Sequence, residues 1–184
     1  MMKTTNKILV VDLEATCWEQ DGQYQRDHSE VIEIGICELD VSSGKISNPK
    51  GILVFPEHSK ISRFCTELTS ITPEMVAREG ISFEDAIDVL FDEYDSSAYT
   101  WASYGAYDRS KMLEECKKKY VDFPFGDQHI NVKEEFKRCN RLRRGIGMKR
   151  ALQQLRIPLE GRHHRGVDDA KNTAKILHWC LNNQ

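Results

Sequence analysis

The sequence of 184 residues lacks any run approaching the roughly 20 apolar residues that cross a bilayer, so we expect no membrane partner. Its first six residues, MMKTTN, are too few and too polar for a secretory signal. The six cysteines are scattered and form no C-x-x-C pair, which argues against a zinc cluster or a dithiol redox site. We therefore expect reduced thiols and a cytoplasmic location.

The sequence also lacks an excess of positive charge. Its 26 basic and 29 acidic residues give a net charge of -3, which argues against a protein that coats polyanions. A nucleic-acid enzyme remains possible, because divalent cations bound to carboxylates reverse the local charge. Repeats, low-complexity tracts and linkers are absent, and the length predicts one domain over residues 7–184 after a flexible tail of residues 1–6.

A β-branched, apolar stretch, ILVVDLEAT at positions 8–16, predicts a buried strand that ends in two carboxylates. Asp12 and Glu14 are two residues apart, so they should share one face at a Cα separation of about 7 Å, with Leu13 on the other face. Two such charges repel by roughly 2 to 3 kcal/mol at an effective dielectric constant near 20. No lysine or arginine lies between positions 7 and 26, which favours a divalent cation as the complement. The alternative is a solvated strand end.

Periodicity and turn signals place the other elements. Alternation over residues 30–40 puts Glu33 and Gly35 on one face of a second strand and Ile34 on the other. We expect further strands over 51–56 and 99–104, a hairpin turn at 42–45, and helices over 83–94, 109–120, 130–139, 148–155 and 167–181. This order, with room for one more strand, predicts an α/β fold with a mixed sheet flanked by helices.

Two later segments supply further acids and a base. Asp108 follows a predicted strand and Gly105 where a helix begins, so it can reach the carboxyl ends of neighbouring strands or simply cap the helix. In GRHHRGVDDAKN, at 161–172, paired histidines precede two aspartates at a helix start. One of the two aspartates can be only a helix-start residue, and histidine pairs are common on surfaces.

The acids and the base are most informative together. Four carboxylates can hold two divalent ions about 3.5 to 4 Å apart, and these ions activate water and stabilise charge on a phosphate. A histidine near its ordinary pKa can deprotonate that water at neutral pH. These groups together predict phosphodiester hydrolysis. A zinc hydrolase is disfavoured, because the sequence has no H-x-x-x-H motif and no clustered cysteines.

Three motifs resemble those of the DEDDh branch of the 3′-to-5′ exonucleases: DLEAT at 12–16, SYGAYD at 103–108 and HHRGVDDAKN at 163–172. Within that branch they look most like the exonucleases of histone mRNA and small interfering RNA, and like bacterial sporulation-inhibitor proteins. The resemblance implies a ribonuclease H-like fold with a five-stranded mixed sheet. It also implies two Mg²⁺ or Mn²⁺ ions held by Asp12, Glu14, Asp108 and Asp169, with His164 as general base.

The family spacing H-x4-D selects His164 over His163 and Asp169 over Asp168, a choice that helical geometry alone cannot make. Asp168 would then lie beside the site or cap the helix.

The resemblance further implies contacts with the terminal nucleotide of a substrate, which His164 would also reach. Stacking on apolar and aromatic side chains contributes roughly 1 to 3 kcal/mol per base. The implied contacts are Glu14, Ala15 and Thr16 to the 3′-terminal sugar, Phe64 and Leu68 on either side of the base, and Tyr107 stacked on the nucleic acid. Core packing is the alternative for the last three. Arg141, Arg143 and Arg144 could follow the phosphate backbone or form a solvated loop.

We therefore expect a metal-dependent 3′-to-5′ exonuclease that releases nucleoside 5′-monophosphates from single-stranded or 3′-overhanging ends. RNA is favoured as substrate and DNA is possible. The alternatives are a regulatory interaction protein that keeps the fold without cutting and a module that protects nucleic-acid ends. The first of these is disfavoured because all five catalytic positions are filled.

Overall fold

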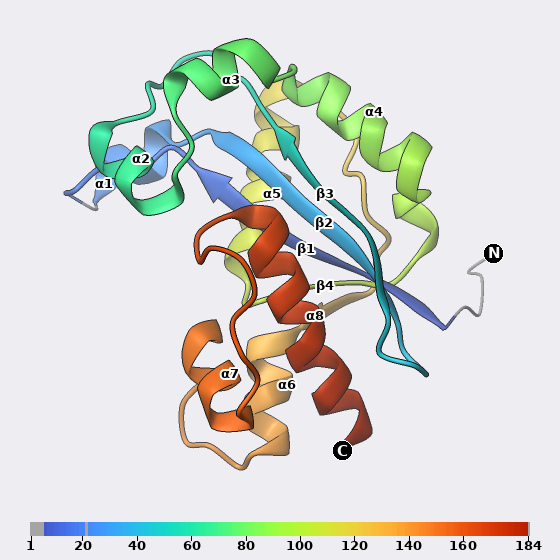
Figure 1. The fold of residues 1–184 in the computed structure, drawn as a ribbon. Helices are drawn as coiled ribbons and strands as arrows, with labels where there is room; N and C mark the ends of the chain where they lie inside the picture. The colour runs from blue at the N-terminus through green and yellow to red at the C-terminus, as the bar shows by residue number, and fades with distance from the viewer. Residues whose placement is uncertain (1–5, 21, 184) are drawn as a thin grey trace.

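The computed structural model describes residues 6–20 and 22–183, so most of the predicted N-terminal tail, residues 1–5, lies outside the described residues. A five-stranded mixed sheet forms the centre, with strand order β3-β2-β1-β4-β5 (Figure 1). The first three strands are antiparallel neighbours, and β4 and β5 run parallel to β1. The strands are β1 Lys7–Ala15, β2 Val31–Asp40, β3 Ile46–Leu53, β4 Trp101–Ser103 and β5 His129–Asn131. The predicted fold class is confirmed.

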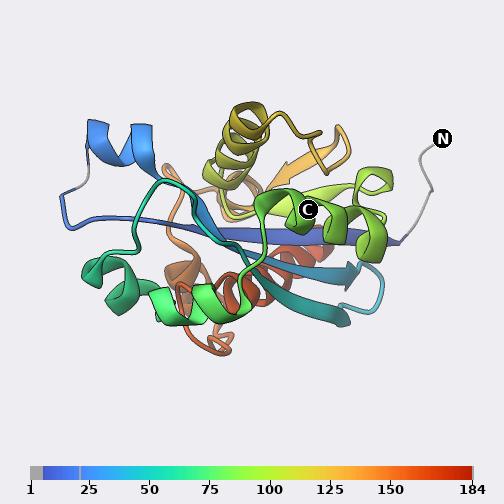
Figure 2. The same cartoon turned by 90° about the horizontal axis from the view of Figure 1, so that it is seen from above.

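Helices cover both faces of this sheet. One apolar cluster joins β1 and β2 to α4 and α5, and another joins the opposite face to α6, α7 and α8. Figure 2 shows α5 and α8 on opposite sides of the sheet. Among the described residues, no helix is long and apolar enough to span a membrane. The helices are α1 Gln23–His28, α2 Arg63–Thr69, α3 Pro73–Glu79, α4 Phe83–Tyr94, α5 Tyr107–Lys119, α6 Val132–Cys139, α7 Met148–Leu155 and α8 Gly166–Asn182.

Several elements differ from the sequence prediction, and three of them show the physical reason. The helix α1 was not predicted, because it buries none of its residues and so carries no apolar periodicity. The strand β3 begins at Ile46 rather than at residue 51, since its ladder depends on pairing with β2 and not on its own polar first half. The segment predicted as a helix over 130–139 begins as the end of β5 and turns helical only at Val132.

Side-chain alternation along β1 directs the two acids. Ile8 and Val10 pack against the helices α6 to α8, whereas Leu9, Val11 and Leu13 pack on the face covered by α4 and α5. By the same alternation Asp12 and Glu14 share the face on which α8 lies, as predicted. Leu13 is buried on the opposite face, also as predicted.

The N-terminus of α8 lies directly against β2. A Cβ atom added to Gly35 would be 1.8 Å from the carbonyl carbon of Gly166, so only glycine allows this approach. The backbone N–H of Gly166 also donates to the carboxylate of Glu33 at 2.8 Å. This contact places the first turn of α8 beside the end of β1 (Figure 1).

We expect Gly35→Ala to destabilise the protein by about 1 to 3 kcal/mol or more, because the new methyl group overlaps backbone atoms that cannot yield. Urea unfolding measures this loss. Gly147→Ala is the matched control: a Cβ there meets nothing within 4 Å, so the change should stay under about 1 kcal/mol. Equal stability of the two variants would show that the approach of α8 to β2 is not tight.

Candidate active site

Three acidic residues from opposite ends of the chain meet at the carboxyl end of β1. Asp12 and Glu14 come from the strand, and Asp169 comes from the first turn of α8. One carboxylate oxygen of each lies within 4.8 Å of the others. The structure thus brings together three of the four predicted metal ligands in one compact group. The solvated strand end is wrong for Glu14, which is only 8% exposed, and Asp169 beside it is 4% exposed.

Asp108, the fourth predicted ligand, approaches from the first turn of α5. Its Oδ1 atom accepts a hydrogen bond of 3.0 Å from the backbone N–H of Leu13, between the two acids of β1. Asp108 is buried and repels Asp12, although it lies outside the compact group of three. The helix-cap alternative is wrong, because Ala106 occupies the N-cap position of α5.

Both histidines of the motif lie at Asp169. The Nδ1 atom of His163 is 2.8 Å from Asp169 Oδ2, and the backbone N–H of His164 donates to the same oxygen at 2.9 Å. The two rings stack with centroids 3.9 Å apart. His164 has a φ of 66°, a left-handed conformation that is uncommon for a residue with a side chain. The side-chain contact with Asp169 is therefore made by His163, while the role of His164 as base stays a prediction.

Asp168 points to different partners from Asp169. Its Oδ2 atom accepts from the backbone N–H of Arg162 at 2.9 Å, and Oδ1 pairs with Lys171 at 2.8 Å. Asp168 therefore holds the turn before α8 and does not cap the helix, whose N-cap residue is Arg165. The burial of Asp169 and the pairing of Asp168 agree with the choice that the family spacing made between them.

An ion pair that the sequence analysis missed anchors the histidine loop. Glu33 of β2 is fully buried and accepts from Arg165 Nε at 3.1 Å and Nη2 at 3.0 Å. Gly166 completes the set of donors. The sequence contained a signal for this pair. Glu33 was predicted on the same face of the strand as Gly35, and a buried acid needs partners. The Glu33–Arg165 ion pair holds the backbone in place at the residue that follows His164.

Burial and mutual repulsion act together on the acids. Desolvation, followed by repulsion from neighbouring carboxylates, raises the pKa of Glu14 to about 9 and that of Asp12 well above its usual range. Desolvation also raises the pKa of Asp108 to about 6 and that of Asp169 above its ordinary value. Each direction shows that the ionised cluster is destabilised when it stands alone, and a cation between the carboxylates would reverse this.

A second observation, an unpaired carboxylate oxygen, also indicates that the acidic cluster can hold a divalent cation. Asp169 Oδ1 is buried and has no hydrogen-bond partner among the residues that the structure describes. An unpaired buried carboxylate oxygen is costly, and a metal ion supplies the missing partner. The donors are all carboxylate oxygens, which suit Mg²⁺ or Mn²⁺ rather than a softer ion.

The predicted substrate residues lie in two environments. The hydroxyl of Thr16 is buried and bonded to Ser59 Oγ and to the backbone N–H of Glu30, both at 2.9 Å. The carbonyl of Ala15 accepts a weak hydrogen bond from the thiol of Cys65 at 3.6 Å. These internal partners hold the strand end in place, and the contacts of Glu14, Ala15 and Thr16 with a sugar stay predictions.

The aromatic and apolar candidates face outward instead. Phe64 on α2 is 38% exposed and Tyr107 at the start of α5 is 55% exposed. Leu68 lies one helical turn after Phe64 and is half-buried. None of the three belongs to the apolar clusters found among the described residues, so core packing does not explain them. Their apolar surface is free to contact a ligand.

The arginines of the loop between α6 and α7 are exposed. Arg141, Arg143 and Arg144 make no ion pair with another described residue. The hydroxyl of Tyr104 donates to the carbonyl of Ile146 at 2.8 Å, which ties this loop to the segment after β4. Both alternatives for the arginines, a solvated loop and a phosphate contact, stay open.

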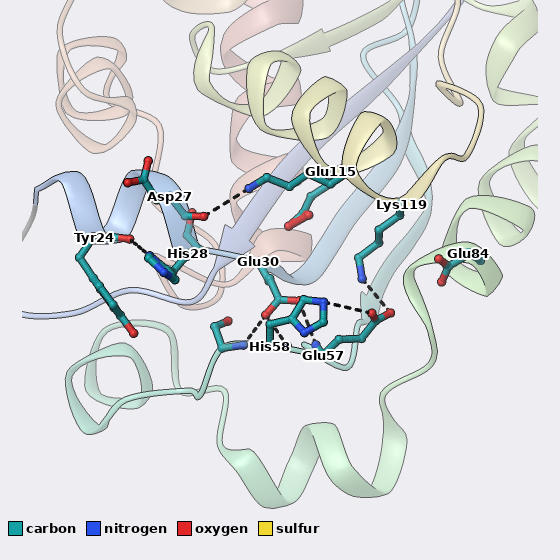
Figure 3. Close-up of a pocket in the computed structure, with 12 residues that line it drawn as sticks. Tyr24, Asp27, His28, Glu30, Glu57, His58, Glu84, Glu115 and Lys119 are labelled. Atoms are coloured by element: carbon teal, nitrogen blue, oxygen red, sulfur yellow. Dashed lines mark hydrogen bonds and ion pairs between the residues drawn. The ribbon is translucent and has the colours of Figure 1, made fainter.

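A cavity of about 470 Å³ lies apart from the acidic cluster, between α1, the start of β2 and the C-terminal end of α5 (Figure 3). Glu30 lines it and accepts backbone hydrogen bonds from Glu57 and His58, each at 2.9 Å. Lys119 pairs with Glu57 at 2.7 Å. None of the predicted catalytic residues lines this cavity. The candidate site is therefore the end of β1.

Known proteins match the chain along nearly its whole length. The model of the RNase T exonuclease family matches residues 9–177. ERI1 exoribonuclease 2 of Xenopus laevis is 31% identical over 194 residues, which cover 92% of this chain and 27% of that protein. The probable 3′-5′ exonuclease KapD of Bacillus subtilis is 28% identical over 179 residues, covering 95% of this chain and 84% of that one. The chain thus spans 27% to 34% of the length of the ERI1 exoribonuclease 2 relatives.

A solved structure shares the fold. The nuclease domain of 3′hExo, a DEDDh family member bound to rAMP, superposes with a TM-score of 0.83 at 23% identity. The match covers 99% of this chain and 94% of that one. The ribonuclease H-like arrangement of sheet and helices that the motifs implied is present here.

Proposed function

The chain belongs to the RNase T exonuclease family, and from this premise we propose that it is a metal-dependent 3′-to-5′ exonuclease of RNA ends. The resemblance of its motifs to the DEDDh branch is confirmed. The proposed reaction is hydrolysis of the last phosphodiester bond of a single-stranded or overhanging 3′ end, with release of a nucleoside 5′-monophosphate. The observation that carries it is the convergence of Asp12, Glu14 and Asp169 beside a histidine pair.

In this proposal Asp12, Glu14, Asp108 and Asp169 hold two divalent cations, Mg²⁺ or Mn²⁺. When bound, the ions would activate water and stabilise the charge that develops on the phosphate. The four acids themselves would be ionised in that state, because the cations offset the desolvation that raises their pKa values and the repulsion that adds to it at Asp12 and Glu14. The hydrogen bond from Leu13 holds the carboxylate of Asp108 against β1.

His164 is the proposed general base. Desolvation, and then the proximity of His163, lower its pKa, so its ring is neutral at neutral pH and can accept a proton from water. The hydrogen bond from its backbone N–H to Asp169 and the Arg165–Glu33 pair limit how far its segment can move. A base held in this way loses little order when the substrate binds.

The exposed apolar side chains support binding of a terminal nucleotide. Phe64 and Leu68 on α2 and Tyr107 on α5 offer surfaces on which bases of any identity can stack. RNA is the proposed substrate because a relative is named an exoribonuclease and the nuclease domain with the same fold holds rAMP. DNA remains possible, because stacking does not distinguish the two sugars.

A gel time course tests this proposal with 5′-labelled single-stranded RNA and DNA of equal sequence, each with Mg²⁺, Mn²⁺ or EDTA. We expect a ladder that shortens from the 3′ end, faster on RNA, only with metal, and absent in Asp12→Ala. Chromatography of the products should show nucleoside 5′-monophosphates. If both substrates stay intact in either metal, the non-cutting interaction protein becomes the better description.

A further inference from the structure

Asp169 belongs to two compact groups of candidate ligands. The first group contains Asp12 and Glu14 and serves the proposed function. The second contains His163, His164 and Asp169, with one ligand atom of each again within 4.8 Å of the others. The proposed reaction uses one ring of the second group as a base and has no use for the ring of His163.

Burial and hydrogen bonds hold the residues of the second group in place. Asp169 is 4% exposed. Its Oδ2 atom is hydrogen-bonded to Nδ1 of His163 and accepts a hydrogen bond from the backbone N–H of His164. Its Oδ1 atom is buried without a partner among the described residues. The side chain of His163 is 33% exposed, so a cation from solution can reach the group. An arginine lies on each side of the histidine pair: Arg165 is paired with Glu33, and Arg162 donates to the backbone carbonyl of Glu67.

The donors of the two groups differ in chemistry. Carboxylates alone suit Mg²⁺ and Mn²⁺, whereas two imidazoles with one carboxylate form a ligand set that Zn²⁺ prefers. We propose that His163, His164 and Asp169 form a binding site for Zn²⁺, distinct from the oxygen-only group and joined to it through Asp169.

A Zn²⁺ ion at this site would engage the ring of the proposed base and a carboxylate that the oxygen-only group needs. Zinc should therefore inhibit cleavage even when Mg²⁺ is saturating. This consequence rests on the proposed function, whereas binding of Zn²⁺ by the three residues does not.

Isothermal titration of ZnCl₂ into the full chain, in saturating Mg²⁺ and without substrate, tests the site. We expect one bound Zn²⁺ in the wild type. His163→Gln keeps a polar side chain but removes a zinc ligand, so it should weaken binding by at least the roughly 10-fold that losing an outer partner costs at metal sites. His58→Gln is the matched control, since the His58 side chain is 85% exposed and lines the separate cavity (Figure 3).

Two further variants and one readout sharpen the result. Asp12→Asn removes a ligand of the oxygen-only group and should leave zinc affinity close to that of the wild type. Unchanged affinity in His163→Gln, or equal losses in His163→Gln and Asp12→Asn, would overturn the proposal, because the ion would then lie elsewhere. Thermal unfolding without metal checks that each variant is folded. Inhibition by zinc, normalised to each variant's own rate, should follow the binding constants, and a chain that cuts nothing still gives a binding result.

Discussion

Replacing His164 by alanine should lower the rate of cleavage by about 10²- to 10⁴-fold, because the attacking water loses its general base. Affinity for RNA should change far less, since the acids and the apolar surfaces of α2 and α5 remain. Single-turnover rates at saturating enzyme separate the two effects. A loss confined to affinity would contradict the assignment of His164 as base.

His163→Ala is the control for this prediction. The structure makes it a stringent one, because the ring of His163 is the one that contacts the Asp169 carboxylate. If His163 only positions Asp169, its loss should be milder than that of His164. Equal or reversed losses would assign the base to His163 and would show that the family spacing does not hold at this motif.

Asp169→Asn should reduce metal-dependent cleavage to the level seen with EDTA. Asp169 belongs to both ligand groups and has a buried oxygen that lacks a protein partner. We expect Mn²⁺ to raise the melting temperature of the wild type, because a ligand that binds the folded state stabilises it, and loss of the Asp169 charge should remove this rise. Both readouts, cleavage and thermal shift, are expected to change together.

Asp168→Asn provides the matched comparison at the neighbouring position. Its carboxylate holds Arg162 and Lys171 instead of facing the acidic cluster, so the variant should retain cleavage and the Mn²⁺ shift with a modest loss of stability. A more severe effect at Asp168 than at Asp169 would contradict the placement of α8 seen in the structure.

Much of the fold was predictable from local patterns. Local periodicity predicted α4 with its observed bounds, and alternation in β1 placed Asp12 and Glu14 on one face. The helix α1 buries no residue and the first half of β3 is polar, so neither of these segments carries a local signal. Such elements depend on contacts with segments elsewhere in the chain. A short stretch of sequence carries no information about those contacts.

The candidate site shows the same division. A D-x-E pair at a strand end, an aspartate at a helix start and a histidine-aspartate motif are visible as residue types, and the resemblance supplied their roles. The approach of Asp169 to Asp12 depends on Gly35 and Gly166, which lie 131 positions apart and let backbones touch. The pairing of Glu33 with Arg165 joins the same two regions.

The sequence by itself determined the strands and helices that carry the acids, the chemistry that those acids favour and the family to which the chain belongs. The elements and their chemistry follow from periodicity and residue types, and the family follows from the resemblance of three short motifs; all of these are local properties. The tertiary structure decided that Asp169 turns inward while Asp168 turns away, that Asp108 is held against Leu13 and that His163 contacts Asp169. Each of these depends on how α5 and α8 pack on the sheet, where close backbone contact sets the direction of every side chain.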